Sequence, residues 1–272
     1  MKVFATYNIK GGVGKTATAV NLAYLSSLDG ARTLIWDLDP QGAATFYFRI
    51  KAKIKGGARR LFRGKGDLDP FIKGTDFDGL DLLPADFSYR HMDLALGDTK
   101  KPGKQLARLL RPLAVEYDIL FFDCAPSISL ASESVFGAAD TLLVPTIPTT
   151  LSLRTLDQLR RYLHKRGMAD LQVLPFFCMV DRRKGLHRDI CDSREMHPFD
   201  FLTTEIPYSS LVEQMGTRRA PLATFAHLSR AAVAYRALWR EVRERQGVTV
   251  PGYDQGATVI DEKVSHERPA HN

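Results

Sequence analysis

The amino-acid sequence predicts one α/β domain with a mostly parallel, doubly wound sheet flanked by helices. Three observations lead to this expectation. Apolar strand-like runs alternate with helical patterns, the first run enters a glycine-rich loop, and two later runs end in aspartate. The 272 residues, 44% of them apolar, can bury a full core. We expect the domain at residues 1–246 and a disordered tail at residues 247–272, where prolines and glycines interrupt a polar background.

The composition excludes several classes of protein. No apolar run approaches the ~20 residues that a membrane span needs, and the chain shows no signal-peptide pattern at its start, so we expect a cytoplasmic protein. Cys124, Cys178 and Cys191 have no metal-ligand spacing and are expected to be reduced thiols. The formal charge of +7 and the pI near 9.3 suggest a polyanionic partner.

The first expected strand, residues 2–7, is joined to an expected helix at residues 16–28 by the loop Asn-Ile-Lys-Gly-Gly-Val-Gly-Lys-Thr. Glycines let the backbone turn its N–H groups inward, and the helix start adds a partial positive charge at the same point. Lys15 can reach β- and γ-phosphate oxygens, and the Thr16 hydroxyl can ligate magnesium. The loop therefore predicts a single-domain P-loop NTPase whose nucleotide is bound by Gly11, Gly12, Val13, Gly14, Lys15, Thr16 and Ala17.

Two further expected strands deliver carboxylates to the edge of the sheet where open α/β folds bind ligands. The strand at residues 33–37 ends in Asp-Leu-Asp-Pro-Gln-Gly, which includes Asp37 and Asp39, and the strand at residues 117–123 ends in Asp123. Asp123 matches a Walker B acid that binds magnesium directly or through water. Asp37 and Asp39 point the same way while the strand continues and could serve magnesium and water; a solvated acidic turn is the alternative.

The remaining segments complete the alternation. We expect strands at residues 80–84, 141–145 and 172–180, and helices at residues 86–96, 103–116, 129–139, 151–166 and 228–245. Pro112 should bend or end the helix that contains it. The last helix should turn Trp239 into the core, with its arginines Arg236, Arg240, Arg243 and Arg245 outward.

The glycine-rich loop departs from the strict phosphate-loop pattern, because Ile9 replaces the first glycine and a second lysine, Lys10, follows. Lys-Gly-Gly-Val-Gly-Lys-Thr resembles the deviant Walker-A loop of the ParA/MinD family of ATPases. The acidic segment after residue 36 and Asp123 before Pro126-Ser127 extend the resemblance over residues 1–245, although Ala125 departs from the family pattern. The chain is most similar to small, Soj-like ParA partition and positioning proteins, because it shows neither a preceding helix-turn-helix domain nor a basic amphipathic membrane helix at its end.

This resemblance implies an ATP-driven dimerisation switch with slow intrinsic turnover. Lys10, Lys15 and Asp39 would be catalytic, with Lys10 reaching the partner subunit's nucleotide and Asp39 positioning the water. Thr16, Asp37 and Asp123 would serve the metal, and Asp181 and Pro207 would lie near the base. The implied cofactors are ATP and Mg²⁺. The implied partners are a second subunit, nonspecific double-stranded DNA of the nucleoid and a ParB-like adaptor or cargo protein, with no membrane.

Basic residues gather in two parts of the chain. Residues 51–66 hold seven bases and no acid, which either phosphate-backbone binding or a solvated surface explains. The family resemblance places further DNA contacts near the ends of the later strands, where solvated clusters that flank helices are the competing account. The DNA-binding candidates there are Arg182, Arg183, Lys184, Arg188, Arg218 and Arg219.

Three other functions fit the same scaffold. One is a metabolic ATP-dependent synthetase of the dethiobiotin synthetase kind, against which the basic charge and Lys10 argue. Another is an iron–sulfur reductase like the nitrogenase iron protein, disfavoured by the positions of the cysteines. The last is a MinD-like nucleotide-regulated adaptor in membrane or secretion machinery.

Overall fold

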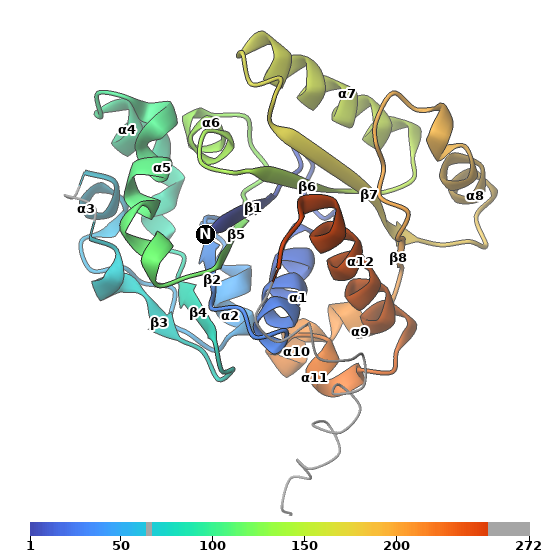
Figure 1. Cartoon of the computed structure of the whole chain (residues 1–272), viewed down its shortest axis with the longest axis horizontal. Helices are drawn as coiled ribbons and strands as arrows, with labels where there is room; N and C mark the ends of the chain where they lie inside the picture. The colour runs from blue at the N-terminus through green and yellow to red at the C-terminus, as the bar shows by residue number, and fades with distance from the viewer. Residues whose placement is uncertain (64–66, 250–272) are drawn as a thin grey trace, which may run out of the picture.

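The computed structural model describes residues 1–63 and 67–249, and its centre is an eight-stranded sheet (Figure 1). The strand order is β3-β4-β2-β5-β1-β6-β7-β8, and every neighbouring pair is parallel except β3 with β4. The predicted α/β class with one mostly parallel sheet is therefore confirmed. The strands are β1 Lys2–Thr6, β2 Thr33–Asp37, β3 Lys73–Gly74, β4 Leu80–Leu83, β5 Ile119–Asp123, β6 Thr141–Thr146, β7 Gln172–Val180 and β8 Ile206–Pro207.

Helices cover both faces of this sheet (Figure 1). The two cores follow from the alternation of side chains along β1, where Val3 and Ala5 face one side and Phe4 the other. The first face carries α3 Gly57–Arg63, α4 Met92–Gly97, α5 Gln105–Leu110, α6 Leu130–Phe136, α7 Thr150–Lys165 and α8 Gly185–Asp192. The second carries α1 Lys15–Leu28, α2 Ala43–Tyr47, α9 Ser210–Glu213, α10 Met215–Arg218, α11 Ala223–Ala226 and α12 Arg230–Gln246.

The predicted segments with long apolar patterns match the structure closely, whereas two helices are broken. Residues 86–96 form a 3-10 turn, Phe87–His91, before α4, because the Asp86 carboxylate accepts the Ser88 amide proton at 2.9 Å and starts a tight turn. In the segment 103–116, Pro112 ends α5 and begins another 3-10 turn, as the missing N–H of proline requires. The basic run contains α3, which the sequence did not predict.

The last helix confirms Trp239 as a core residue, stacked edge-on against Phe4 and Phe121. The expectation that Arg243 points outward is wrong. Its guanidinium is buried and pairs with the carboxylate of Asp29, which also accepts the indole N–H of Trp239. A buried arginine is tolerated there because an acid at the end of α1 neutralises it.

The C-terminal part of the chain is described only to residue 249. Gly247 closes α12 with a left-handed φ of 57°, which a residue without a Cβ adopts at little cost. The predicted disordered tail at residues 247–272 lies almost wholly outside the described residues. In the described part, no helix combines the length and the apolar character that crossing a membrane requires.

Candidate functional site

The glycine-rich loop joins β1 to α1 through a tight backbone turn. Gly12 and Gly14 have φ values of 69° and 94°, a region that residues with a Cβ rarely adopt. A Cβ at Gly14 would also lie 2.9 Å from the Cys178 sulfur of β7, so the loop packs tightly there. A Cβ at Gly11 or Gly12 would meet no atom within 4 Å, so the loop is open at these two exposed positions.

Two features keep this loop ready for an anion. Asn8 fastens it, because its side-chain amide donates to the Pro145 carbonyl oxygen at 2.9 Å and its Oδ1 accepts the Lys10 amide proton at 2.9 Å. The first turn of α1 has neither a side-chain cap nor an acid, so its backbone N–H groups remain available for phosphate oxygens. The sequence analysis did not assign Asn8 a role; its position directly after the strand was the available signal.

Lys15 points into the centre of the loop. Its side chain is buried, and its ammonium group donates to the backbone oxygen of Lys10 at 2.8 Å. Burial lowers its pKa, and the nearby Asp123 carboxylate acts in the opposite direction. A lysine held in this way can exchange the carbonyl oxygen for a phosphate oxygen without first being turned inward.

Asp123 and Asp37 lie side by side at the carboxyl ends of β5 and β2, where they are register partners. Both Asp123 carboxylate oxygens are buried and have no hydrogen-bond partner among the described residues. Burial and the charge of Asp37 raise the Asp123 pKa well above its usual range. An unpaired buried carboxylate is costly on its own and is satisfied by a cation, so this position fits Mg²⁺.

Asp37 uses its carboxylate differently. It accepts the Thr45 amide proton at 2.8 Å, the Thr45 hydroxyl at 2.7 Å and the Asp39 amide proton at 3.2 Å. Its burial outweighs these bonds and raises its pKa to about 6. Asp37 thereby holds α2 and the loop at residues 38–42 next to Asp123, and its oxygens are already engaged by hydrogen bonds of the chain.

Asp39 begins the loop at residues 38–42, which continues from β2. One of its oxygens accepts the Gln41 amide proton at 2.9 Å, a local turn that fixes the direction of the carboxylate. The Asp39 charge acts on both Lys15 and Asp123, so the structure brings these three predicted residues together. Magnesium would draw its remaining ligands from the Thr16 hydroxyl, the nucleotide and water, because the described residues contain no cluster of three His, Cys, Asp or Glu side chains suited to a metal.

Lys10 belongs to the glycine-rich loop, but its side chain extends away from the loop toward α7. Its ammonium group lies 3.4 Å from the hydroxyl of Ser152 at the start of α7, and its half-buried side chain forms no ion pair with any carboxylate of the described residues. Lys15 thus lies inside the loop, whereas Lys10 is directed toward α7.

Asp181 and Pro207 line one pocket of about 600 Å³ at the ends of β7 and β8. Arg183 holds the Asp181 carboxylate through two hydrogen bonds of 2.8 and 3.0 Å and lowers its pKa to about 2. The pocket lies at the end of β7, and Cys178 of the same strand lies beside Gly14 of the glycine-rich loop. The pocket and the loop are therefore near each other along β7. The pocket can accept the part of a nucleotide that extends beyond its phosphates.

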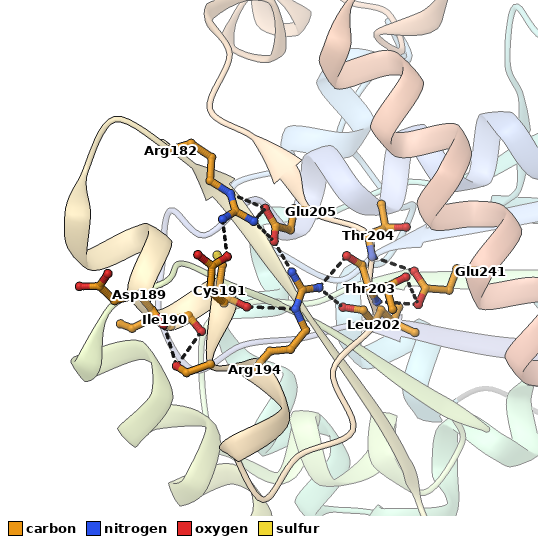
Figure 2. A network of polar contacts seen from close by, with 12 residues as sticks. Arg182, Asp189, Ile190, Cys191, Arg194, Leu202, Thr203, Thr204, Glu205 and Glu241 are labelled. Atoms are coloured by element: carbon orange, nitrogen blue, oxygen red, sulfur yellow. Dashed lines mark hydrogen bonds and ion pairs between the residues drawn. The ribbon is translucent and has the colours of Figure 1, made fainter.

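The DNA-binding candidate Arg182 is engaged in a network of ion pairs (Figure 2). Its guanidinium pairs with Asp192 at 2.6 Å and with both oxygens of Glu205, and Arg194 pairs with the same Glu205. Arg194 also donates to backbone oxygens of the segment before β8. Arg182 therefore links Asp192 of α8 to Glu205, which directly precedes β8, and its side chain serves the fold rather than an external phosphate.

The other candidates do not form one surface with Arg182. Arg183 pairs with Asp181, whereas Lys184 and Arg188 are exposed and form no ion pair with any described residue. Arg218 lies over the Phe225 ring of α11, and Arg219 lies over the Phe46 ring of α2. In Figure 1, α10 lies next to α2, while α8 lies beyond β7 at the opposite end of the sheet. The six candidates are therefore split between two regions, and hydrogen bonds occupy several of them.

Replacing Glu205 with alanine should lower the free energy of unfolding by about 1–3 kcal/mol, because Arg182 and Arg194 lose their shared carboxylate. The Glu205 side chain is only 16% exposed, so water cannot fully replace it. Arg183→Ala is the matched control, since its ion pair lies on the surface, where water screens it, and its loss should change the free energy of unfolding much less. Urea unfolding measures both values. If the two variants lost the same free energy of unfolding, the network around Glu205 would stabilise the fold no more than an exposed ion pair does.

Comparison with known proteins identifies the family. A family model described as an AAA domain matches residues 1–170. The sporulation initiation inhibitor protein Soj of Bacillus subtilis is 30% identical over 247 residues, which cover 89% of this chain and 98% of Soj. The chain belongs to the ParA/MinD family of P-loop ATPases. The chromosome partitioning protein ParA of Myxococcus xanthus, another relative of this ParA/MinD ATPase, is 29% identical over 90% of the chain and 88% of that protein.

Solved structures place the same fold in a metabolic enzyme. Cobyrinic acid a,c-diamide synthase of Mycobacterium smegmatis with bound ADP and magnesium is 26% identical to this ParA/MinD ATPase and superposes with a TM-score of 0.76. The alignment covers 92% of this chain and 98% of that one. The same synthase is also known with a bound ATP analogue and magnesium.

Proposed function

We propose that this protein is a ParA-type ATPase, a switch that dimerises with ATP and is reset by hydrolysis. The observation that carries the proposal is the division of labour between two lysines. Lys15 is buried inside the loop of its own chain, whereas the half-buried Lys10 extends away from it to the buried hydroxyl of Ser152, 3.4 Å away. A second subunit packed beside the loop would offer its nucleotide to Lys10 in place of this long bond, so that each site of a two-fold dimer is completed by its partner.

The cofactors are ATP and Mg²⁺. The backbone N–H groups of the loop and the first turn of α1 bind the phosphates, and Lys15 exchanges its bond to the Lys10 carbonyl oxygen for a phosphate oxygen. Thr16 and Asp123 hold Mg²⁺, which neutralises charge on the phosphates when bound. The pocket beside Asp181 and Pro207 takes the base and sugar.

Hydrolysis needs a water oriented toward the γ-phosphate. Asp39 supplies the carboxylate that orients this water, because its turn keeps the group near Lys15 and Asp123 without burying it completely. Lys10 of the second subunit stabilises the charge that develops on the transferred phosphoryl group. Turnover is slow until a partner protein stabilises the complete arrangement.

The output of the switch is reversible attachment to DNA. The net charge of +7 and the similarity to Soj and to ParA of M. xanthus support a DNA-bound dimer that positions a plasmid, a chromosome region or a protein cargo. A ParB-like adaptor or cargo protein would stimulate hydrolysis and release the dimer. The protein would then cycle between the cytoplasm and the nucleoid.

Asp39→Ala should separate binding from hydrolysis. We expect the variant to bind ATP with wild-type affinity, because Lys15, Thr16 and Asp123 are unchanged, and to accumulate as a DNA-bound dimer. Hydrolysis should fall by about 10² to 10⁴-fold, as is usual when a group that manages the proton of the attacking water is lost. Fluorescent nucleotide binding, light scattering and phosphate release measure these three properties.

Asp39→Asn is the matched variant, since it keeps the size and the Gln41 hydrogen bond while removing the charge. It should be as slow as Asp39→Ala if the carboxylate itself acts on the water. A monomeric Asp39→Ala protein in ATP would count against the assigned role, because the residue would then be needed for assembly.

A second candidate function is an ATP-dependent synthetase, which the cobyrinic acid a,c-diamide synthase structure favours at 26% identity. Such an enzyme would consume ATP only with its carboxylate substrate, and DNA would leave its rate unchanged. ATP hydrolysis measured with and without duplex DNA distinguishes the two functions. A MinD-like adaptor would instead respond to lipid vesicles in the same assay.

A further inference from the structure

Two hollows lined by cations adjoin α3, which lies in the same group of helices as α4 and α5 in Figure 1. The first, of about 760 Å³, is lined by Lys51, Lys53, Lys55, Arg60 and Lys73. The second, of about 860 Å³, is lined by Lys100, Lys101, Lys104, Arg108 and Arg111, with Asp98 as its one acid. The helix α3 contributes to both hollows and contacts α5. We call these ten cations the basic flank.

The side chains of the basic flank are available for an external ligand. All ten residues are exposed, and none forms an ion pair with any residue in the described ranges 1–63 and 67–249. Arg182 and Arg183 differ, because carboxylates of their own chain already neutralise them. Exposed cations of this kind can exchange their counterions for phosphate groups without breaking an ion pair among the described residues, although Arg60 also lies over the Phe71 ring.

The basic flank also accounts for the charge of the whole chain. Ten cations and one acid give its lining a formal charge of +9, whereas the entire chain carries +7. The rest of the chain is therefore slightly negative. An extended polyanion that approaches the protein would be attracted to this region first.

We propose that the basic flank binds the phosphate backbone of double-stranded DNA; this rests on the proposed function and assigns its DNA contact to a surface. The cations are spread over two adjoining hollows rather than converging on one point, which suits an extended ligand with regularly repeated charges. Seven of the ten are lysines, which contact phosphates as point charges and read no bases. Such contacts give sequence-independent binding.

The basic flank is connected to the nucleotide site by a short path. A Cβ at Gly42, in the loop that follows Asp39, would lie 3.3 Å from the Cβ of Ala52, between Lys51 and Lys53. The next residue, Ile54, is fastened by its amide to Asp86 at 2.7 Å. A change in the loop at residues 38–42 on ATP binding would therefore press directly on the segment that carries the first three lysines. DNA binding by the flank should depend on the nucleotide.

The experiment compares two double charge reversals in the full chain with Mg²⁺ and ATP. Lys51→Glu/Lys53→Glu alters the basic flank, and Lys184→Glu/Arg188→Glu alters exposed, unpaired cations beside α8, so both change the net charge by the same amount. The probe is a linear duplex of random sequence, titrated at several salt concentrations. We expect the flank variant to lose at least ~10-fold in affinity and about 2 from its salt slope, and the α8 variant to change less than ~3-fold.

A second flank variant, Lys101→Glu/Lys104→Glu, tests whether local unfolding around residues 51–53 explains the loss of affinity. It lies on a different element, so it should show the same loss if the basic flank binds DNA. An equal loss in the flank and α8 variants would overturn the proposal, since net charge alone would then explain it. If only the α8 variant lost affinity for DNA, the protein would still bind DNA, but the basic flank would not be the surface that does so. If the wild type did not bind DNA at all, the proposed function would be rejected. If it instead bound polyglutamate, and the flank variants lost that binding, the basic flank would be a site for an acidic protein.

Discussion

Lys10→Ala is expected to reduce ATP hydrolysis by about 10³-fold, the magnitude by which a cation supplied from a partner subunit accelerates phosphoryl transfer. The physical reason is the loss of one positive charge at the transferred phosphoryl group. The variant should still bind ATP, because Lys15 and the loop amides remain. The backbone oxygen of residue 10, which accepts the Lys15 ammonium, is also unchanged by the substitution. Steady-state phosphate release and equilibrium nucleotide binding give the two values.

Ser152→Ala serves as the control for this variant. It removes the hydroxyl that lies 3.4 Å from the Lys10 ammonium in the single chain but keeps the lysine itself. Its rate should stay within about threefold of the wild type, because the cation is needed at the partner's nucleotide and a bond of this length adds little. Wild-type turnover by Lys10→Ala would remove Lys10 from the catalytic residues.

Asp123→Asn should have opposite effects on the free energy of unfolding in the absence and in the presence of Mg²⁺ and ATP. Without nucleotide, the free energy of unfolding should rise by about 1–3 kcal/mol, because the variant removes a buried carboxylate charge whose oxygens have no hydrogen-bond partner among the described residues and which the nearby Lys15 charge offsets only in part. With saturating Mg²⁺ and ATP, the wild type should gain about 3 kcal/mol at a hundredfold excess over Kd, and the variant little of it. Thermal unfolding with and without Mg²⁺ and ATP measures both effects.

The pH dependence of the Asp123→Asn effect provides a further check. The Asp123 pKa in the folded protein is raised, so the folded state holds its proton to higher pH than the unfolded state does. Wild-type stability should therefore fall as the pH rises above the ordinary range of aspartate, whereas the variant should lack this loss. The two proteins should converge in acid, where the carboxyl group is neutral in both states.

Asp37→Asn is the control, because its carboxylate accepts three hydrogen bonds that an amide cannot all accept. This variant should lower the stability of the ligand-free protein by about 1–3 kcal/mol, which is opposite in sign to Asp123→Asn. If both variants destabilised the protein equally, Asp123 would be a structural acid and the magnesium position would have to be sought elsewhere.

The sequence predicted the parts of the fold in which one local pattern decides the structure. Long apolar runs located β1, β5 and β7, and the glycine pattern located the loop before α1. The breaks in residues 86–96 and 103–116 depend on a capping carboxylate, Asp86, and on where Pro112 acts, and only the second leaves a clear signal in the sequence.

The charged surfaces could not be predicted in the same way. Arg182 looks free in the sequence, but its partners Asp192 and Glu205 lie 10 and 23 residues away and meet it only in the folded chain. The basic run at residues 51–66 was visible, whereas its continuation at Lys100–Arg111 lies beside it only because α3 contacts α5. Likewise, the lack of partners for Asp123 is a property of packing, which no local pattern records.

The central claim is that Lys10 acts at the nucleotide of a second subunit, and mixing two inactive variants tests it most directly. Lys10→Ala keeps Asp39 at its own site, and Asp39→Ala keeps a Lys10 that it can offer to a partner. An equal mixture should recover roughly a quarter of the wild-type rate, because half of the random dimers are mixed and each mixed dimer holds one complete site. A mixture no more active than its separate components would contradict the shared site.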